Sequence, residues 1–145
     1  MQRILLATAV LLAALRADAC TAPAAQSSRR PLHGPWRWIS STGGITGIRM
    51  DPASEGFSAI FYFQRDGTVD IYRDDRRQDR LILDAVPKTT ANAPPSLRLH
   101  YAHPLSIFPF DPGIDHQTAR LAATDTLLLI DPCCDRYTHT LARIE

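Results

Sequence analysis

The sequence has almost no excess of charge of either sign. Its 145 residues include 16 Lys and Arg against 15 Asp and Glu, a net charge of +1. Proteins that bind nucleic acid need clustered cations to neutralise phosphates, so this balance argues against a nucleic-acid partner. The 3 cysteines are too few for a small fold built on disulfides. A chain of this length can bury a sizeable core without that support, and one folded domain is expected.

The sequence also lacks the short motifs that accompany common enzyme chemistry. It has no G-x-S-x-G nucleophile turn, no Gly-rich phosphate loop and no H-E-x-x-H metal motif. Its carboxylates at Asp66, Asp74, Asp75 and Asp79 occur in turn-like and solvent-exposed contexts. We therefore predict a protein without catalytic residues, without a metal and without a cofactor.

The first nineteen residues have the layout of a secretory signal peptide. Arg3 supplies a positive start, residues 4–15 form an apolar run, and residues 17–19 read Ala-Asp-Ala, an A-x-A cleavage site. The apolar run is too short for a transmembrane helix, which takes about 20 residues. The sequence therefore predicts a signal peptide over residues 1–19 and export of the chain.

Cleavage after residue 19 would place Cys20 at the new N-terminus and leave it two alternatives. It becomes the lipidated cysteine of a bacterial lipoprotein, or it stays a plain thiol on a secreted protein. Residues 21–31 are rich in Pro, Ala and Ser, a composition typical of a tether between an anchored terminus and a folded domain. This favours lipidation at Cys20, a flexible tether over residues 20–31, location in the cell envelope and contact with the membrane through the lipid anchor only.

From Leu32 onward the sequence is typical of an all-β domain over residues 32–145. Short β-rich runs with alternating apolar residues are separated by turn residues, and no stretch has helical spacing over three turns. The pattern predicts eight strands, at residues 36–41, 57–64, 68–73, 80–86, 96–102, 117–123, 126–130 and 137–144.

The connections between these strands favour an eight-stranded antiparallel up-and-down β-barrel. Polar turns at residues 74–78 and 124–125 are short enough to join neighbouring antiparallel strands. Residues 42–56 and 103–116 are longer and are predicted to be loops. A closed barrel has no unpaired edges, and at eight strands its interior is filled with side chains or holds one small ligand.

Three patches of the sequence resemble small bacterial lipocalin-like envelope proteins. They are LHGPWRWISSTGGI at residues 32–45, the F-x-x-D-G-T hairpin at residues 63–68, and DPCCDRYTH at residues 131–139. Arg136 and Leu141 depart from the pattern, which has Gly and an aromatic residue at these places. The resemblance implies that Trp36 packs across the bottom of the barrel and that Arg143 lies over its ring and closes the barrel structurally.

An aromatic stripe is the candidate lining of a ligand site. Phe57, Phe61 and Phe63 share one strand face, and Tyr72 and Tyr101 follow on later strands. We take Phe61, Phe63, Tyr72 and Tyr101 as candidate ligand-binding residues, with a packed core as the alternative.

The adjacent cysteines Cys133 and Cys134 are the most unusual local feature. Three cysteines allow a bridge between Cys20 and either of them, or a disulfide between Cys133 and Cys134. A lipidated Cys20 would leave only the vicinal pair. Two packed thiols, or a thiol or metal site, are the alternatives to a disulfide, although the neighbouring residues match no zinc-binding spacing.

The histidines at positions 100, 103 and 116 are predicted to lie at the barrel rim. His100 and His103 are an odd number of residues apart, which directs them to opposite faces of a strand and argues against a shared metal.

Together these features predict an exported, non-enzymatic barrel. The leading hypothesis is that it binds a small apolar ligand in the barrel or at its mouth, gated by residues 42–56 and 103–116. The alternative is a filled barrel that acts through its surface, as an envelope interaction or inhibitor module.

Overall fold

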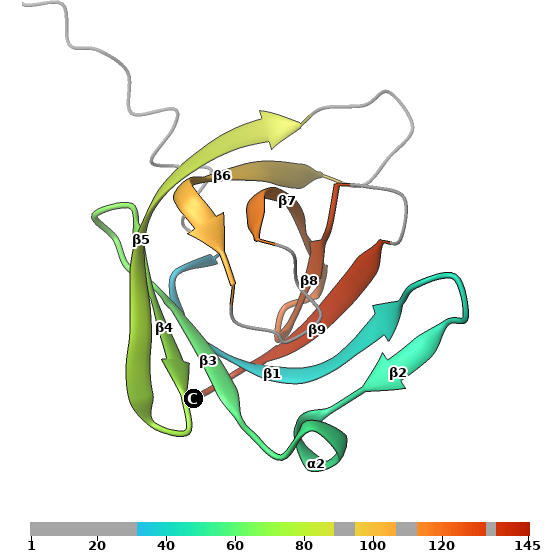
Figure 1. Ribbon diagram of the computed structural model, residues 1–145. Coiled ribbons are helices and arrows are strands. Elements are labelled where there is room, and N and C mark those ends of the chain that lie inside the picture. Colours follow the sequence, from blue (N-terminus) through green and yellow to red (C-terminus); the bar gives the residue numbers. More distant parts are fainter. Residues whose placement is uncertain (1–31, 89–94, 107–112, 133–135) are drawn as a thin grey trace, which may run out of the picture.

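The computed structural model describes residues 32–88, 95–106, 113–132 and 136–145 (Figure 1). The predicted signal peptide, the tether and all three cysteines, Cys20, Cys133 and Cys134, lie outside these residues.

The described residues form an eight-stranded antiparallel barrel with one additional strand, which confirms the predicted architecture (Figure 1). Each barrel strand pairs with the next along the chain, and β1 pairs with β9 to close the sheet. The strands are β1 Gly34–Gly43, β2 Ile48–Met50, β3 Ala59–Phe63, β4 Thr68–Arg73, β5 Arg76–Lys88, β6 Ser96–Leu105, β7 Ile114–Ala123, β8 Thr126–Ile130 and β9 Tyr137–Arg143.

The prediction of a loop over residues 42–56 was wrong. The segment contains β2 and the short helix α2, Pro52–Glu55. β3 pairs only with the first part of β1, so the edge of β1 at residues 41–43 is available to β2. The Asp51 side chain accepts hydrogen bonds from the backbone N–H groups of Ala53 and Ser54, which caps α2.

Residues 103–116 were also predicted as a loop, but both ends of this segment are strand. β6 continues to Leu105 and β7 begins at Ile114. The pairing moves from His100 with His116 to Leu105 with Ile114, so the strands separate locally around Pro104. Because proline has no N–H to donate to a ladder, this irregular pairing accommodates it.

The barrel interior is filled by side chains from every barrel strand. Alternate residues point inward, as the strand period requires. Trp36 and Trp38 of β1 have exposed fractions of 0%. The other large side chains with almost no exposure are Phe61, Ile71, Leu81, Leu99, Leu105, Leu127, Leu129, Leu141, Gln117 and His139.

The two ends of the barrel are named here after residues of β1. The Trp36 end holds the start of β1, the β3–β4 turn at residues 64–67 and the β7–β8 turn at residues 124–125. The Ser41 end holds the β1–β2 hairpin, which extends away from the barrel (Figure 1), and the β4–β5 turn at residues 74–75. The chain enters the barrel at the Trp36 end through Leu32.

Candidate functional site

At the Trp36 end, the ring of Trp36 lies between the chain entrance and β9. Its Nε1–H donates a hydrogen bond of 2.7 Å to the Leu32 carbonyl. The Arg143 guanidinium carbon lies 4.2 Å from the Trp36 ring centroid, and Arg143 Nη1 donates to the His33 carbonyl at 2.8 Å. This contact between cation and ring contributes up to about 2 kcal/mol. The pair therefore covers the core at this end and offers no reactive group.

Towards the Ser41 end, polar side chains replace apolar ones inside the barrel. A β-bulge between Trp38 and Ser40 shifts the register, so that Ser41 pairs with His139 of β9. The Ser41 hydroxyl accepts from Trp38 Nε1 at 2.9 Å and lies 2.6 Å from His139 Nδ1. Ser41 and His139 are 0% and 1% exposed.

The chain of hydrogen bonds continues from His139 to Asp131, which directly follows β8, and then to β7 and β6. His139 Nε2 lies 3.3 Å from Asp131 Oδ1, which also accepts from Gln117 Nε2 at 2.8 Å. Tyr101 donates its hydroxyl proton to Gln117 Oε1 at 2.7 Å. When His139 donates from Nε2 to Asp131, its Nδ1 accepts from the Ser41 hydroxyl. Every link in this buried chain then has a donor and an acceptor.

The order Ser41, His139, Asp131 resembles the hydrogen-bond order of serine hydrolases. A nucleophile must reach its substrate, however, and the Ser41 side chain is completely buried. The chain therefore connects β1, β9, β7 and β6 inside the barrel through Asp131, the residue that follows β8, a structural contribution of the kind that buried polar networks make.

Sequence analysis missed this buried chain. Gln117 and His139 occupy inward positions in strands whose other inward residues are apolar, such as Ala119 and Leu141. A polar residue at a strand position where the alternation calls for an apolar one is the sequence feature that could have indicated these two residues. Ser41 could not have been found in this way, because the bulge in β1 changes which residues face inward.

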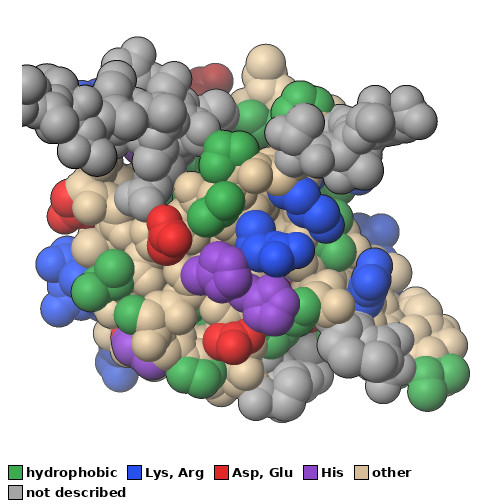
Figure 2. All heavy atoms as spheres, turned by 90° about the horizontal axis from the view of Figure 1, so that it is seen from above, with side chains coloured by type: hydrophobic (Ala, Val, Ile, Leu, Met, Phe, Trp, Pro, Cys, Tyr) green, Lys and Arg blue, Asp and Glu red, His purple; other side chains and the backbone are tan. Residues whose placement is uncertain are grey.

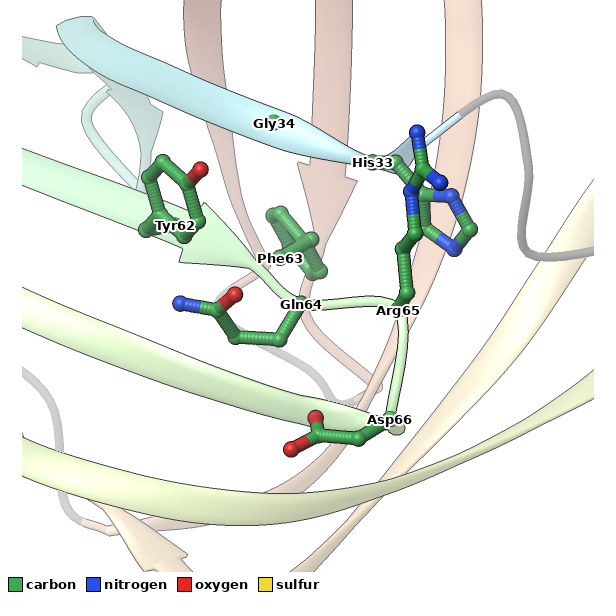
Figure 3. A pocket seen from close by; sticks show the side chains of 7 residues that line it. All are labelled: His33, Gly34, Tyr62, Phe63, Gln64, Arg65 and Asp66. Atoms are coloured by element: carbon green, nitrogen blue, oxygen red, sulfur yellow. The ribbon is translucent and has the colours of Figure 1, made fainter.

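A surface hollow of about 490 Å³ lies at the Trp36 end (Figure 3). It is lined by His33 and Gly34, from the start of β1, and by Tyr62, Phe63, Gln64, Arg65 and Asp66, from the end of β3 and its turn. The turn is tight because Gly67 adopts a φ of +87°, which glycine tolerates. This turn places residues 64–66 at the end of β3, beside Tyr62 in the lining of the hollow.

The electrostatics of the hollow come from two turn residues of opposite charge. The Asp66 carboxylate accepts from the Thr68 hydroxyl at 2.8 Å and from the Thr68 backbone N–H at 2.9 Å. These hydrogen bonds lower the pKa of Asp66, chiefly through the hydroxyl, and hold the carboxylate in the turn. Arg65 is exposed, and in Figure 3 its side chain extends beside the His33 ring.

The four candidate ligand-binding residues are not brought together. Phe61, Phe63 and Tyr101 point into the core, and of the four only Phe63 also lines the hollow. Tyr72 does not share this inward face. The inward positions of β4 are Val69 and Ile71, so Tyr72 lies on the outer face, as strand alternation requires.

The outer wall near this hollow contains a buried carboxylate. Asp70 is 2% exposed although it faces outward, because Arg80 and Gln64 cover it. Arg80 Nε and Nη2 donate to its two oxygens at 2.6 and 2.8 Å. This bidentate contact lowers the pKa of Asp70 against the opposing effect of burial.

No group of three or more His, Cys, Asp or Glu residues is arranged to hold a metal ion within residues 32–88, 95–106, 113–132 and 136–145. In the same part of the chain, no helix has the length and apolarity needed to cross a membrane.

Comparisons with protein-family models, with curated proteins and with solved structures find no match to this chain.

Proposed function

We propose that this protein is an exported, non-enzymatic, lipocalin-like barrel that binds a small ligand with an apolar body and a polar head group in the hollow at its Trp36 end. The observation that carries the proposal is the hollow itself. Its volume of about 490 Å³ lies within the range of about 300–1,000 Å³ that is usual for small-molecule sites.

The lining of the hollow supports this class of ligand. Tyr62, which is 38% exposed, offers aromatic surface to an apolar body, and Gln64 and Arg65 offer donors to a polar head. The barrel interior is a poorer candidate, because Trp36, Trp38 and Phe61 fill it. The proposal therefore places the ligand at the end of the barrel and outside its core.

Export is the part of the proposal that rests on the sequence. A positive start, an apolar run and an A-x-A site precede a tether that leads to Leu32.

Native mass spectrometry of protein purified from its own envelope tests the proposal. We expect a co-purifying small molecule whose occupancy falls in Arg65→Ala and in Tyr62→Ala. The matched control is Arg49→Ala, since Arg49 is also exposed but lies on β2 at the other end of the barrel. A ligand-free protein, or equal loss of ligand in Arg49→Ala, would contradict the proposal.

A filled barrel that acts through its surface is the second candidate, and the β1–β2 hairpin favours it. Ile45 and Ile48 are 92% and 54% exposed on this hairpin. Exposed apolar side chains on a projecting element are typical of interaction sites. The same purification distinguishes the candidates: this one predicts a ligand-free barrel with a bound protein that is lost in Ile45→Ser and retained in Arg65→Ala.

A further inference from the structure

Two histidines from neighbouring strands lie side by side on the outer wall of the barrel, away from the predicted rim. His100 of β6 and His116 of β7 are direct partners in the antiparallel register. Their rings are stacked, with centroids 5.7 Å apart and an interplanar angle of 21°. Figure 2 shows neighbouring histidine side chains in the open, with charged side chains around them.

A carboxylate fixes which nitrogen of His116 is available. His116 Nδ1 lies 2.6 Å from Asp115 Oδ1. A carboxylate without a proton can only accept, so the proton in this contact belongs to the imidazole. His116 therefore donates its Nδ1 proton to Asp115. In the neutral ring, Nε2 then carries no proton and its lone pair can bind a metal ion. Metal-binding histidines characteristically have this arrangement, with the second ring nitrogen donating to a carboxylate.

The separation of the two rings matches that of two imidazoles on one metal ion. With a metal–nitrogen distance of about 2.0–2.1 Å, each ring centroid would lie about 3.2 Å from the ion. At ligand angles of about 110–130°, the two centroids would then be about 5.2–5.8 Å apart. The observed 5.7 Å falls in this range, so the two rings have the spacing that binding to one ion requires.

We propose that His100 and His116 form a two-histidine binding site for a divalent transition-metal ion of the Zn²⁺ type on the outer wall of the barrel. Neutral imidazole is a preferred ligand of this class of ion. Water completes the coordination, so the affinity is lower than that of structural zinc sites with four protein ligands. Asp84 of β5 is the register partner of His100 and adds negative charge on the other side of the pair.

His103 supplies a matched control within the same strand. It is also an exposed histidine near a carboxylate, with its Nε2 3.7 Å from Asp79 Oδ1, and its side chain is 53% exposed. It is three residues beyond His100, where the pairing of β6 with β7 is interrupted, and its contact is with β5. Replacing His103 removes an imidazole without touching the proposed site.

Zinc titration by isothermal calorimetry tests the proposal on tag-free mature protein with its thiols blocked by alkylation. We expect one Zn²⁺ per chain, with affinity reduced about tenfold or more in His100→Ala and in His116→Ala and unchanged in His103→Ala. Asp115→Asn should weaken binding by about 10-fold, since loss of an outer carboxylate typically costs 10–100-fold. Zinc affinity that survives in His100→Ala, or that falls equally in His103→Ala, would overturn the proposal.

NMR of the unmodified protein provides a second readout that needs no variant. Addition of Zn²⁺ should shift the ring resonances of His100 and His116 together and leave those of His103 in place. Absence of a shift at either ring of the pair would reject the site even if a variant failed to fold.

Discussion

Asp70 illustrates how a single side chain on the outer wall couples stability to pH. Arg80 holds its pKa below the ordinary value of 3.8. A carboxylate with a lowered pKa in the folded state contributes stability above the pKa of the unfolded chain. That contribution is lost as the pH falls from about 4 through the lowered pKa, because the folded state must then bind a proton that breaks the contact with Arg80.

We therefore predict that Asp70→Asn is less stable than the parent protein at pH 7 but loses less stability on acidification. Urea denaturation at pH 7 and pH 3 measures both quantities. Asp75→Asn is the control, since Asp75 is an exposed carboxylate in the β4–β5 turn. If Asp70→Asn and the parent protein lost the same free energy of unfolding between pH 7 and pH 3, this role for Asp70 would be contradicted.

Ser41 is a small residue whose replacement is expected to lower stability. Its hydroxyl contacts both Trp38 Nε1 and His139 Nδ1 inside the barrel. Removing it deprives two buried polar atoms of this partner, which typically costs about 1–3 kcal/mol. We predict a loss of this size for Ser41→Ala in urea denaturation, and a change within about 0.5 kcal/mol for Ser106→Ala, at an exposed site. Equal effects of the two changes would show that the hydrogen-bond chain adds nothing to stability.

At the scale of elements, β1 organises the barrel because it pairs with three other strands. It contacts β3 near the Trp36 end, β2 near the Ser41 end, and β9 along most of its length. Gly43 is the last residue of β1 and pairs with Tyr137, the first residue of β9. A Cβ at Gly43 would collide with the Arg136 carbonyl and lie 2.6 Å from Tyr137 Cα. Both obstacles are backbone and cannot rotate away.

Gly43→Ala is therefore predicted to destabilise the protein by about 1–3 kcal/mol, the usual cost of overpacking. The neighbouring change Thr42→Ala, at an exposed position of the same strand, should stay within about 0.5 kcal/mol. Chemical denaturation compares the two variants. A tolerated Gly43→Ala would mean that the start of β9 can move away from β1.

The strand positions show how far local pattern can specify an element. Residues 68–73 and 126–130 were predicted with the bounds that the structure has, because polar turn residues limit both strands. β2 and α2 were missed within residues 42–56. A three-residue strand has too few residues to show alternation. β2 pairs with the last residues of β1, which extend beyond the part of β1 that pairs with β3.

At the scale of the whole molecule, a filled interior makes Trp36 a central part of the core. Trp36→Ala removes a completely buried indole and should cost about 3–5 kcal/mol in denaturant unfolding. Ile82→Ala is a suitable control, since Ile82 is 67% exposed on β5. A cost below about 1 kcal/mol for Trp36→Ala would contradict its place at the closed end of the barrel.

The mature form of the chain is a further prediction at this scale. Cleavage after residue 19 would leave 126 of the 145 residues, starting at Cys20. We expect the intact mass of protein from its native membrane fraction to exceed that of this chain by a lipid group, because the tether composition favours anchoring. A mature chain that starts at an unmodified Cys20 would exclude lipidation.

The sequence by itself determined the all-β class, the eight barrel strands and their antiparallel order. These follow from alternation of apolar residues and from short polar turns, which act over a few neighbouring residues. Tertiary structure decided what these strands enclose. Three features depend on bulges and on cross-strand register: the inward position of Ser41, the contact of His139 with Asp131, and the pairing of His100 with His116. Register is set by the fit of whole strands to one another, so no local pattern specifies it.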